Sequence, residues 1–239
     1  MDIATGYGEP AISAAQCVGS QGCVLGIDIS LQMLEIAKER SKALGFENII
    51  TFKEADIERL DLPNSFFDVA VCRWGLMFLP NLNTVLKKIY DALFPGGRFA
   101  AAVWSHPSKV PLISLPMDII RREIGSQIPQ TQTQQTRLGP FSLSNINTLK
   151  QSFIRIGFTD IRTELANVTF KLPSAKQFVQ AIQELSLSIN MVLNNVASVK
   201  RVKILDAITD ELNHNYRDKK TGHIGLTKEV ICLAGRKSE

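Results

Sequence analysis

Strand-like and helix-like segments alternate along the first hundred residues, and this alternation limits the possible folds more than any other feature. Four short apolar runs have the length of buried strands: residues 22–29, 48–54, 67–74 and 98–104. The stretches between them repeat apolar residues at helical spacing, as Leu34, Ala37 and Leu44 do. Alternating strands and helices form a parallel sheet with helices on both faces. The sequence therefore predicts a doubly wound α/β domain.

The pattern changes after Ser105. Helix-like pieces occur in residues 106–150 and 174–213, a long strand is expected over 160–172, and the chain closes with a strand-like run over 229–234. The segment from Ser126 to Arg137 is rich in Gln and Thr, has no apolar period, and is expected to be a mobile loop.

Composition and charge exclude several classes of function. Charged residues make up 21% of the chain, the net charge is +4, and the basic residues are scattered, so we expect no nucleic-acid partner. No apolar stretch reaches the ~20 residues of a membrane span, and the N-terminus does not resemble a signal peptide. The four cysteines lack C-x-x-C spacing, which predicts free thiols in a reducing, cytoplasmic setting. The three histidines lack metal-ligand spacing, so no metal site is expected.

The most informative motif is the loop Asp2-Ile-Ala-Thr-Gly-Tyr-Gly-Glu-Pro-Ala11. Glycines at positions 6 and 8 allow a sharp turn and a close approach to a ligand. The helix expected from Pro10 presents free N–H groups that favour negative charge. The pattern also fits a dinucleotide-binding fingerprint, so alone it does not separate NAD from other adenosyl ligands.

Acidic residues follow two of the expected strands. Asp28 ends the strand at 22–29, 20 residues after Gly8, where a carboxylate can accept hydrogen bonds from both hydroxyls of a ribose. Asp56 follows the next strand in Glu54-Ala55-Asp56, where an acid and its neighbouring N–H could read an adenine edge. The spacing favours a nucleoside-containing ligand.

Together these motifs resemble class I S-adenosylmethionine-dependent methyltransferases of the ubiquinone- and menaquinone-biosynthesis type, known as type 11. The resemblance is carried by DIATGYGEPA, GIDIS, EADIERLDLP, FFDVAVCRWGLMFLPN and LFPGGRFAAAVW, and it covers residues 1 to about 105. It implies a Rossmann-like, mostly parallel seven-stranded sheet. It further implies a cofactor-binding core at 1–105, helical insertions and an antiparallel strand covering the acceptor side at 106–222, and a closing edge strand at 223–239 of the same sheet.

The resemblance also implies S-adenosyl-L-methionine as cofactor and assigns its contacts. The glycine-loop positions that hold its methionine portion are Asp2, Ala4, Gly6 and Gly8. Asp28 matches the ribose-binding acid with Ile29 beside the adenine, and Asp56 matches the adenine-reading acid with Ile57 next to it. Cys72 and Arg73 match the segment that meets the methionine end. Met77 and Phe78 fall in the loop that usually faces the acceptor.

One departure from the family pattern concerns the first strand. The family has a full strand before the acid matched by Asp2, whereas this chain starts at Met1, so we expect this strand to be absent or stunted. It is normally central, and its loss would leave buried N–H and C=O groups unpaired at about 1–3 kcal/mol each. Our hypothesis is that Met1 is an internal methionine of a longer protein.

The expected chemistry is methyl transfer to a C or O atom of a small, apolar or quinone-like acceptor. His106, after the expected strand at 98–104, is the candidate general base for an acceptor that must lose a proton. Large side chains at Trp74, Met77, Phe78 and Trp104 could line an apolar acceptor pocket or simply pack the core. The sequence leaves the acceptor and the oligomeric state open.

Two other functions remain open at this point. An NAD-dependent oxidoreductase could use the same glycine loop, but the spacing Y-x-x-x-K occurs only at Tyr216 and Lys220, in a polar run far from the expected sheet. A truncated, non-catalytic relative is the second alternative, and the missing first strand favours it.

Overall fold

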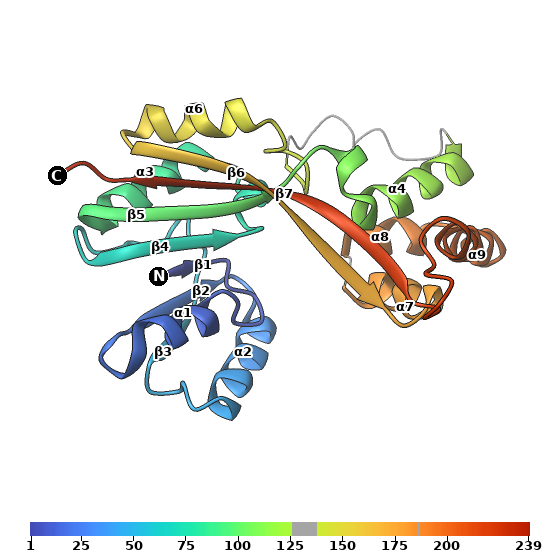
Figure 1. Cartoon of the computed structure of the whole chain (residues 1–239), viewed down its shortest axis with the longest axis horizontal. Coiled ribbons are helices and arrows are strands. Elements are labelled where there is room, and N and C mark those ends of the chain that lie inside the picture. The colour runs from blue at the N-terminus through green and yellow to red at the C-terminus, as the bar shows by residue number, and fades with distance from the viewer. Residues whose placement is uncertain (126–137, 186) are drawn as a thin grey trace. The chain divides into compact units, whose positions relative to one another are not determined.

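The computed structural model describes residues 1–125, 138–185 and 187–239 (Figure 1). The Gln/Thr-rich segment at 126–137 lies outside the described residues. The seven strands form one sheet in the order β3-β2-β1-β4-β5-β7-β6. This arrangement confirms the predicted α/β fold with a seven-stranded, mostly parallel sheet.

The strands at the start of the chain pair in parallel. They are β1 (Asp2–Ile3), β2 (Val24–Asp28), β3 (Ile50–Glu54), β4 (Phe67–Arg73) and β5 (Leu93–Trp104). The first of them is stunted, with two residues, and it pairs with both β2 and β4 through Asp2, which lies opposite Gly26 and Val71. The carboxyl ends of these parallel strands therefore meet at one edge of the sheet.

Helices connect these strands as the sequence predicts. They are α1 (Ala11–Val18), α2 (Leu31–Ala43) and α3 (Leu82–Ala92), followed later by α6 (Ile146–Ile156). Short 3₁₀ turns occur at η1 (Gly19–Gln21), η2 (Leu76–Phe78) and η3 (Pro107–Lys109). Ser30 caps α2 by accepting the Met33 N–H at 3.4 Å, and Gly45 follows the helix with a φ of +76°.

The strand expected from Arg98 begins earlier than predicted. β5 starts at Leu93, which pairs with Phe67 across an irregularity in the register. Gly96 and Gly97 are held by the sheet, because the Gly96 N–H donates to the Lys237 carbonyl oxygen at 3.0 Å. The Lys237 N–H donates in turn to the Gly97 carbonyl oxygen at 2.8 Å. Pairing with a segment near the end of the chain thus accompanies the early start of β5.

The described chain divides into two compact units. The first holds residues 1–104, 138–165 and 231–239, and the second holds the described residues of 105–137 and 166–230. The long strands β6 (Thr159–Leu172) and β7 (Ile224–Arg236) contribute to both.

Each unit has its own apolar core. In the first unit, the aromatic rings of Phe99, Phe153 and Phe158 form a cluster, with Phe99 stacked on Phe153 at a centroid distance of 5.2 Å.

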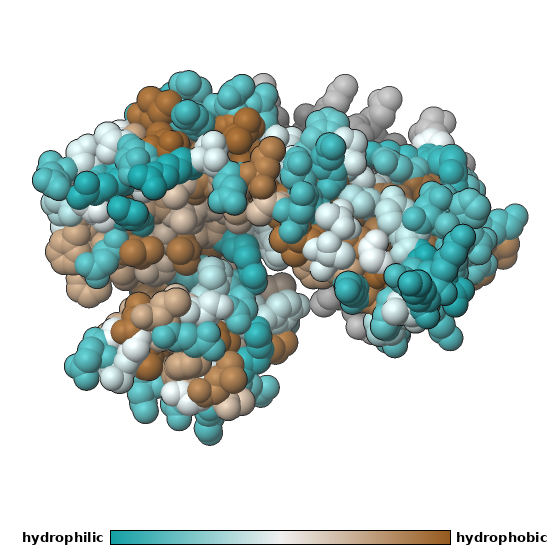
Figure 2. Space-filling view, in the orientation of Figure 1, coloured by the Kyte–Doolittle hydropathy of each residue, from teal (hydrophilic) through white to brown (hydrophobic). Residues whose placement is uncertain are grey.

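The first unit also has apolar surface. In the space-filling view, brown hydrophobic surface lies over β4 and β5, strands whose exposed apolar side chains include Val69 and Phe94 (Figure 2).

The second unit is mainly helical. Its helices are α4 (Pro111–Ile124), α7 (Ala175–Leu185), α8 (Leu187–Asn194) and α9 (Ser198–Asn215). Ile120, Phe178, Leu193 and Ile208 are buried between them. Among the helices that the structure describes, none is both long and apolar enough to span a membrane.

Candidate cofactor site

A cavity of about 750 Å³ opens at the carboxyl edge of the parallel strands. Ala4 follows β1, Asp28 ends β2, Ala55 follows β3 and Arg73 ends β4, and all four line the cavity. The carboxyl edge is where doubly wound sheets bind their ligands. The volume lies in the range of small-molecule and cofactor sites.

Most of the sequence-predicted cofactor residues lie on this cavity. Its lining includes Ala4, Gly6, Asp28, Ile29, Asp56, Ile57 and Arg73. Asp2, Gly8 and Cys72 are not among the lining residues, so any contribution from them acts through other groups.

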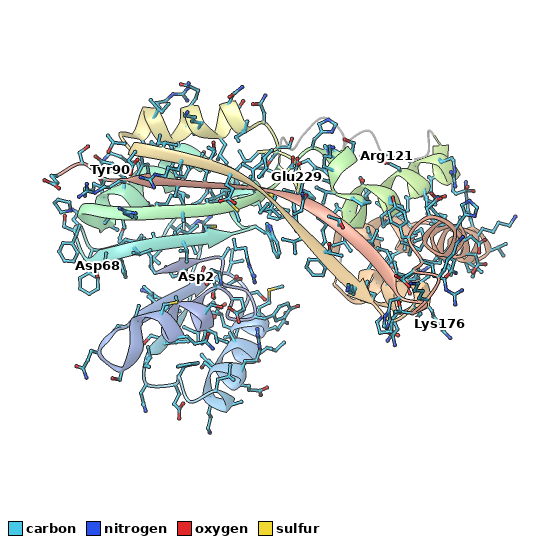
Figure 3. The ribbon with its side chains drawn as sticks, viewed as in Figure 1. Asp2, Asp68, Tyr90, Arg121, Lys176 and Glu229 are labelled. Carbon is cyan, nitrogen blue, oxygen red and sulfur yellow. The ribbon has the colours of Figure 1, made fainter. Side chains whose placement is uncertain are left out.

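Asp2 holds the glycine loop in shape through two buried hydrogen bonds. Its side chain is fully buried, and Oδ2 accepts hydrogen bonds from Thr5 Oγ1 at 2.5 Å and from the Ala11 N–H at 2.8 Å. Burial raises the pKa of Asp2 to about 7, although both hydrogen bonds favour the charged form. Figure 3 labels Asp2 beside β1. The residue therefore ties β1 to the glycine loop at Thr5 and to the start of α1.

Gly6 and Gly8 have different structural roles. Both have positive φ, +54° at Gly6 and +92° at Gly8, which only glycine adopts freely. A Cβ on Gly8 would lie 3.0 Å from Ile12 Cδ1 and 3.2 Å from Ala37 Cβ, so this glycine lets α1 and α2 pack closely. Gly6 lies on the cavity itself, where its missing side chain leaves room for a ligand.

Asp28 is oriented by two backbone donors. Its Oδ2 accepts the Gly6 N–H at 2.8 Å and its Oδ1 accepts the Ser30 N–H at 2.9 Å. An ionised carboxylate has about four lone-pair sites, so two acceptor positions remain after these bonds. The arrangement suits a vicinal diol, such as the two hydroxyls of a ribose.

Asp56 and two isoleucines line another part of the cavity. Asp56 Oδ1 accepts the Glu58 N–H at 2.9 Å, which fixes the turn after β3. Ile57 is 7% exposed, whereas Ile29 is 70% exposed although it lines the cavity. An exposed aliphatic side chain beside a fixed acid fits a flat ring with a polar edge.

Cys72 and Arg73 are neighbours at the end of β4 with different exposure, because successive residues of a strand alternate sides. Cys72 is buried, burial raises the pKa of its thiol to about 12, and it lines a second cavity of about 570 Å³, which Arg73 also lines. Arg73 is exposed and lines the first cavity, and its Nη2 donates to the Glu9 carbonyl oxygen at 3.4 Å. Arg73 thus brings a positive charge to this site.

Two lining residues, Met33 and Arg40, lie outside every motif that the sequence offered. Arg40, in the third turn of α2, donates through Nη1 to the Tyr7 carbonyl oxygen and lies 3.4 Å through Nη2 from Glu9 Oε1. Tyr7, Glu9, Met33, Arg40, Leu79 and Pro80 all line the cavity. The helical spacing of Leu34, Ala37 and Leu44 predicts a helix here, but which of its residues reaches the glycine loop depends on how that helix packs.

The residues considered for the acceptor side have different environments. Met77 is fully buried, and its Sδ accepts the Trp104 N–H at 3.3 Å. Phe78, which is 52% exposed, and Trp74 line the cavity. The side chain of Trp104 stacks on Trp74, with ring centroids 4.3 Å apart.

The predicted base His106 belongs to the second unit. Its Nδ1 lies 2.9 Å from Ser108 Oγ and accepts the Ser108 N–H at 3.3 Å, so the imidazole caps η3. In the same unit, Ser105 Oγ donates to Glu229 Oε1 at 2.6 Å, and Figure 3 labels that glutamate. The role of His106 as a base stays a prediction.

Other predicted features concern cysteines and metals. All four cysteines are free thiols, as expected. Within the described ranges, no group of three or more His, Cys, Asp or Glu side chains is placed to hold a metal ion.

Comparison with known proteins places this chain in a family. Residues 1–153 match the family model described as a methyltransferase domain. The demethylmenaquinone methyltransferase of Lactococcus lactis is 37% identical over 108 residues, which are 45% of this chain and 42% of that protein. The match thus spans less than half the length of this relative. A ubiquinone/menaquinone biosynthesis C-methyltransferase of Francisella tularensis is 30% identical over 175 residues, 71% of this chain and 69% of that protein.

Solved structures agree on the fold. The YcgJ protein of Bacillus subtilis has a TM-score of 0.61 at 17% identity, covering all of this chain and 91% of that one. A Haemonchus contortus phosphoethanolamine N-methyltransferase in complex with S-adenosyl-L-methionine has a TM-score of 0.56 at 20% identity, covering all of this chain and 48% of that one. With the sequence match over the cavity residues, these findings show that the chain belongs to the class I methyltransferase family, in its ubiquinone and menaquinone branch.

Proposed function

We propose that this chain is an S-adenosylmethionine-dependent methyltransferase that methylates a C or O atom of a small, apolar, quinone-like acceptor. The observation that carries the proposal is Asp28, whose carboxylate is fixed by the Gly6 and Ser30 N–H groups at the carboxyl end of β2. The same cavity contains Asp56 and the glycine loop. The names of the quinone-methylating relatives support the acceptor class.

The residues present fit such a cofactor. Asp28 has acceptor positions left for the ribose hydroxyls, and Asp56 with Ile29 and Ile57 would hold the adenine. Ala4 and Gly6 offer backbone close to the methionine portion, and Arg73 lines the same cavity at the end of β4. When bound, the cofactor supplies a sulfonium methyl group as the electrophile.

This chain's own task is then to orient the acceptor and exclude water. Trp74, Phe78, Leu79 and Pro80 give the cavity an apolar wall suited to a ring. His106 stays our proposed general base for an acceptor that must lose a proton. Since its Nδ1 is hydrogen-bonded to Ser108, Nε2 is the nitrogen that would take the proton.

A cytoplasmic location and the absence of a nucleic-acid partner belong to the same proposal.

Calorimetric titration tests the cofactor. S-adenosylhomocysteine is expected to bind with micromolar-class affinity, about 8 kcal/mol, while NADH produces no comparable heat. NADH binding without S-adenosylhomocysteine binding would favour the oxidoreductase alternative. A methyl-transfer assay with S-adenosylmethionine and reduced 1,4-naphthoquinone then separates an active enzyme from a relative that only binds the cofactor.

A further inference from the structure

Trp74, directly after β4, has an unusual backbone. Its φ is +62°, a region that bulky side chains rarely occupy. Its N–H donates to the Ala102 carbonyl oxygen at 2.8 Å, which holds this residue against β5. The next residue is Gly75, where a Cβ would lie 2.5 Å from Ala4 Cβ. Backbone strain that surrounding contacts maintain in this way clusters at ligand-binding and catalytic sites.

The indole of Trp74 is packed but lacks one hydrogen bond. Its ring stacks on Trp104 with an interplanar angle of 16°, and the Arg73 guanidinium carbon lies 4.8 Å from its centroid. Nε1 is buried and has no hydrogen-bond partner among the residues that the structure describes. A buried donor without a partner is rare and costly, and buried tryptophan N–H groups usually find an acceptor.

The Trp74 N–H lacks a hydrogen-bond acceptor, and the residues around Trp74 indicate which kind of ligand could supply one. Trp74 lines the same cavity as Asp28 and Arg73, so a ligand in that cavity can reach this side chain. Arg73 provides positive charge over the ring, which favours an anionic oxygen. Trp74, Phe78 and Leu79 favour a flat apolar body for the rest of the molecule. An aromatic ring that bears an ionised hydroxyl group satisfies all three conditions.

We propose that Trp74 binds the methyl acceptor through its indole N–H, which donates a hydrogen bond to a phenolate-type oxygen that also faces Arg73. Nε1 is buried from solvent in this structure. The proposal therefore includes a movement of the indole, in which its N–H edge turns toward the cavity as the acceptor enters. The hydrogen bond to the acceptor oxygen then satisfies the unpaired N–H. This proposal rests on the proposed function and names the acceptor class of that site.

The variant Trp74→Phe tests the hydrogen bond, because phenylalanine keeps an aromatic ring but has no N–H. The ring is also smaller than an indole, and the naphthalene control below measures the effect of that lost packing. The probe is 1,4-naphthoquinol, titrated anaerobically into protein saturated with S-adenosylhomocysteine. We expect Trp74→Phe to weaken naphthoquinol binding about tenfold or more, as the loss of a hydrogen bond to a charged group does. Its affinity for S-adenosylhomocysteine should stay within about twofold of the unmodified chain, a difference of about 0.4 kcal/mol, which also shows that the variant is folded.

Two controls separate a hydrogen bond from ring packing. Trp104→Phe changes the other half of the stacked pair and should leave naphthoquinol binding within about threefold, or about 0.65 kcal/mol. Naphthalene has no oxygen, so any change in its affinity in Trp74→Phe measures the smaller ring alone and should be less than the change for naphthoquinol. Equal naphthoquinol affinity in both proteins would overturn the proposal, as would an equal loss of naphthalene and naphthoquinol.

The outcomes for the two proposals are distinct. If S-adenosylhomocysteine does not bind the unmodified chain, the proposed function fails and the Trp74 proposal fails with it. If S-adenosylhomocysteine binds but naphthoquinol does not, the Trp74 proposal and its acceptor class are overturned, and cofactor binding stands.

Discussion

The Asp28 carboxylate accepts the backbone N–H of Gly6 at 2.8 Å, which joins the end of β2 to the middle of the glycine loop. The Asp2 side chain holds the same loop by accepting hydrogen bonds from Thr5 Oγ1 and the Ala11 N–H. The loop is therefore fixed by two carboxylates before any ligand enters. A preformed loop lowers the conformational entropy that binding would otherwise cost.

Asp28→Asn is expected to weaken S-adenosylhomocysteine binding about tenfold or more, or about 1.4 kcal/mol. Asparagine keeps the size of the side chain, but it loses the charge and turns one acceptor into a donor. Calorimetric titration measures the effect. Glu39→Gln is the matched control, since Glu39 is an exposed acid of α2 outside the cavity lining. Equal affinities in the two variants would remove Asp28 from the site.

Gly8→Ala should destabilise the fold more than Gly45→Ala does. Both positions have positive φ, +92° and +76°, so both substitutions carry a backbone cost of about 1–2 kcal/mol. Only the alanine at position 8 meets neighbours, at 3.0 Å from Ile12 Cδ1 and 3.2 Å from Ala37 Cβ, whereas nothing lies within 4 Å at Gly45. Overpacking adds about 1–3 kcal/mol, which urea unfolding of the two variants will show as a difference in midpoint.

Lys228 should make stability depend on pH. Its side chain is 1% exposed in the second unit and lies over the Phe170 ring, and burial lowers its pKa from 10.5 to about 7. Between these values the unfolded chain binds more protons than the native one, so the free energy of unfolding rises with pH from about 7 to about 10.5. Lys228→Met should remove this rise.

Urea midpoints at pH 7 and pH 9.5 measure the Lys228 contribution. Lys219→Met replaces an exposed lysine of the same unit and should keep the rise of the unmodified chain. If Lys228→Met keeps the rise in the free energy of unfolding between pH 7 and pH 9.5, Lys228 is charged in the native state over that pH range.

His106→Asn should lower turnover of naphthoquinol about 10²-fold or more and leave S-adenosylhomocysteine binding unchanged. Asparagine is a good capping residue, so it can replace the bond that Nδ1 accepts from the Ser108 N–H while removing the base. An unchanged rate would leave His106 with its capping role in η3 only.

Much of the cavity lining at the carboxyl edge of the sheet could be predicted because its signals are local. Gly6, Asp28 and Asp56 lie within a few residues of strand ends, so strand positions alone bring them to one edge of the sheet. The cap of α2 at Ser30 is equally local, because the capping bond joins residues three apart.

Features that depend on distant packing could not be predicted. Arg40 reaches Tyr7 across 33 positions of sequence, and the early start of β5 depends on pairing with Lys237 near the end of the chain. Periodicity also gave no sign that the residues 138–165 belong with the first unit. In each case the decisive contact joins segments that no sequence window contains together.

The stacking of Trp74 on Trp104 gives this protein a built-in optical reporter. The sequence contains two tryptophans, and both are in this pair, one of them on the cavity wall. Intrinsic fluorescence and near-ultraviolet circular dichroism therefore report on a single place in the molecule. Ligand entry can be followed in real time by stopped-flow mixing without any label, and the rate at which the indole moves can be separated from the rate at which the ligand arrives.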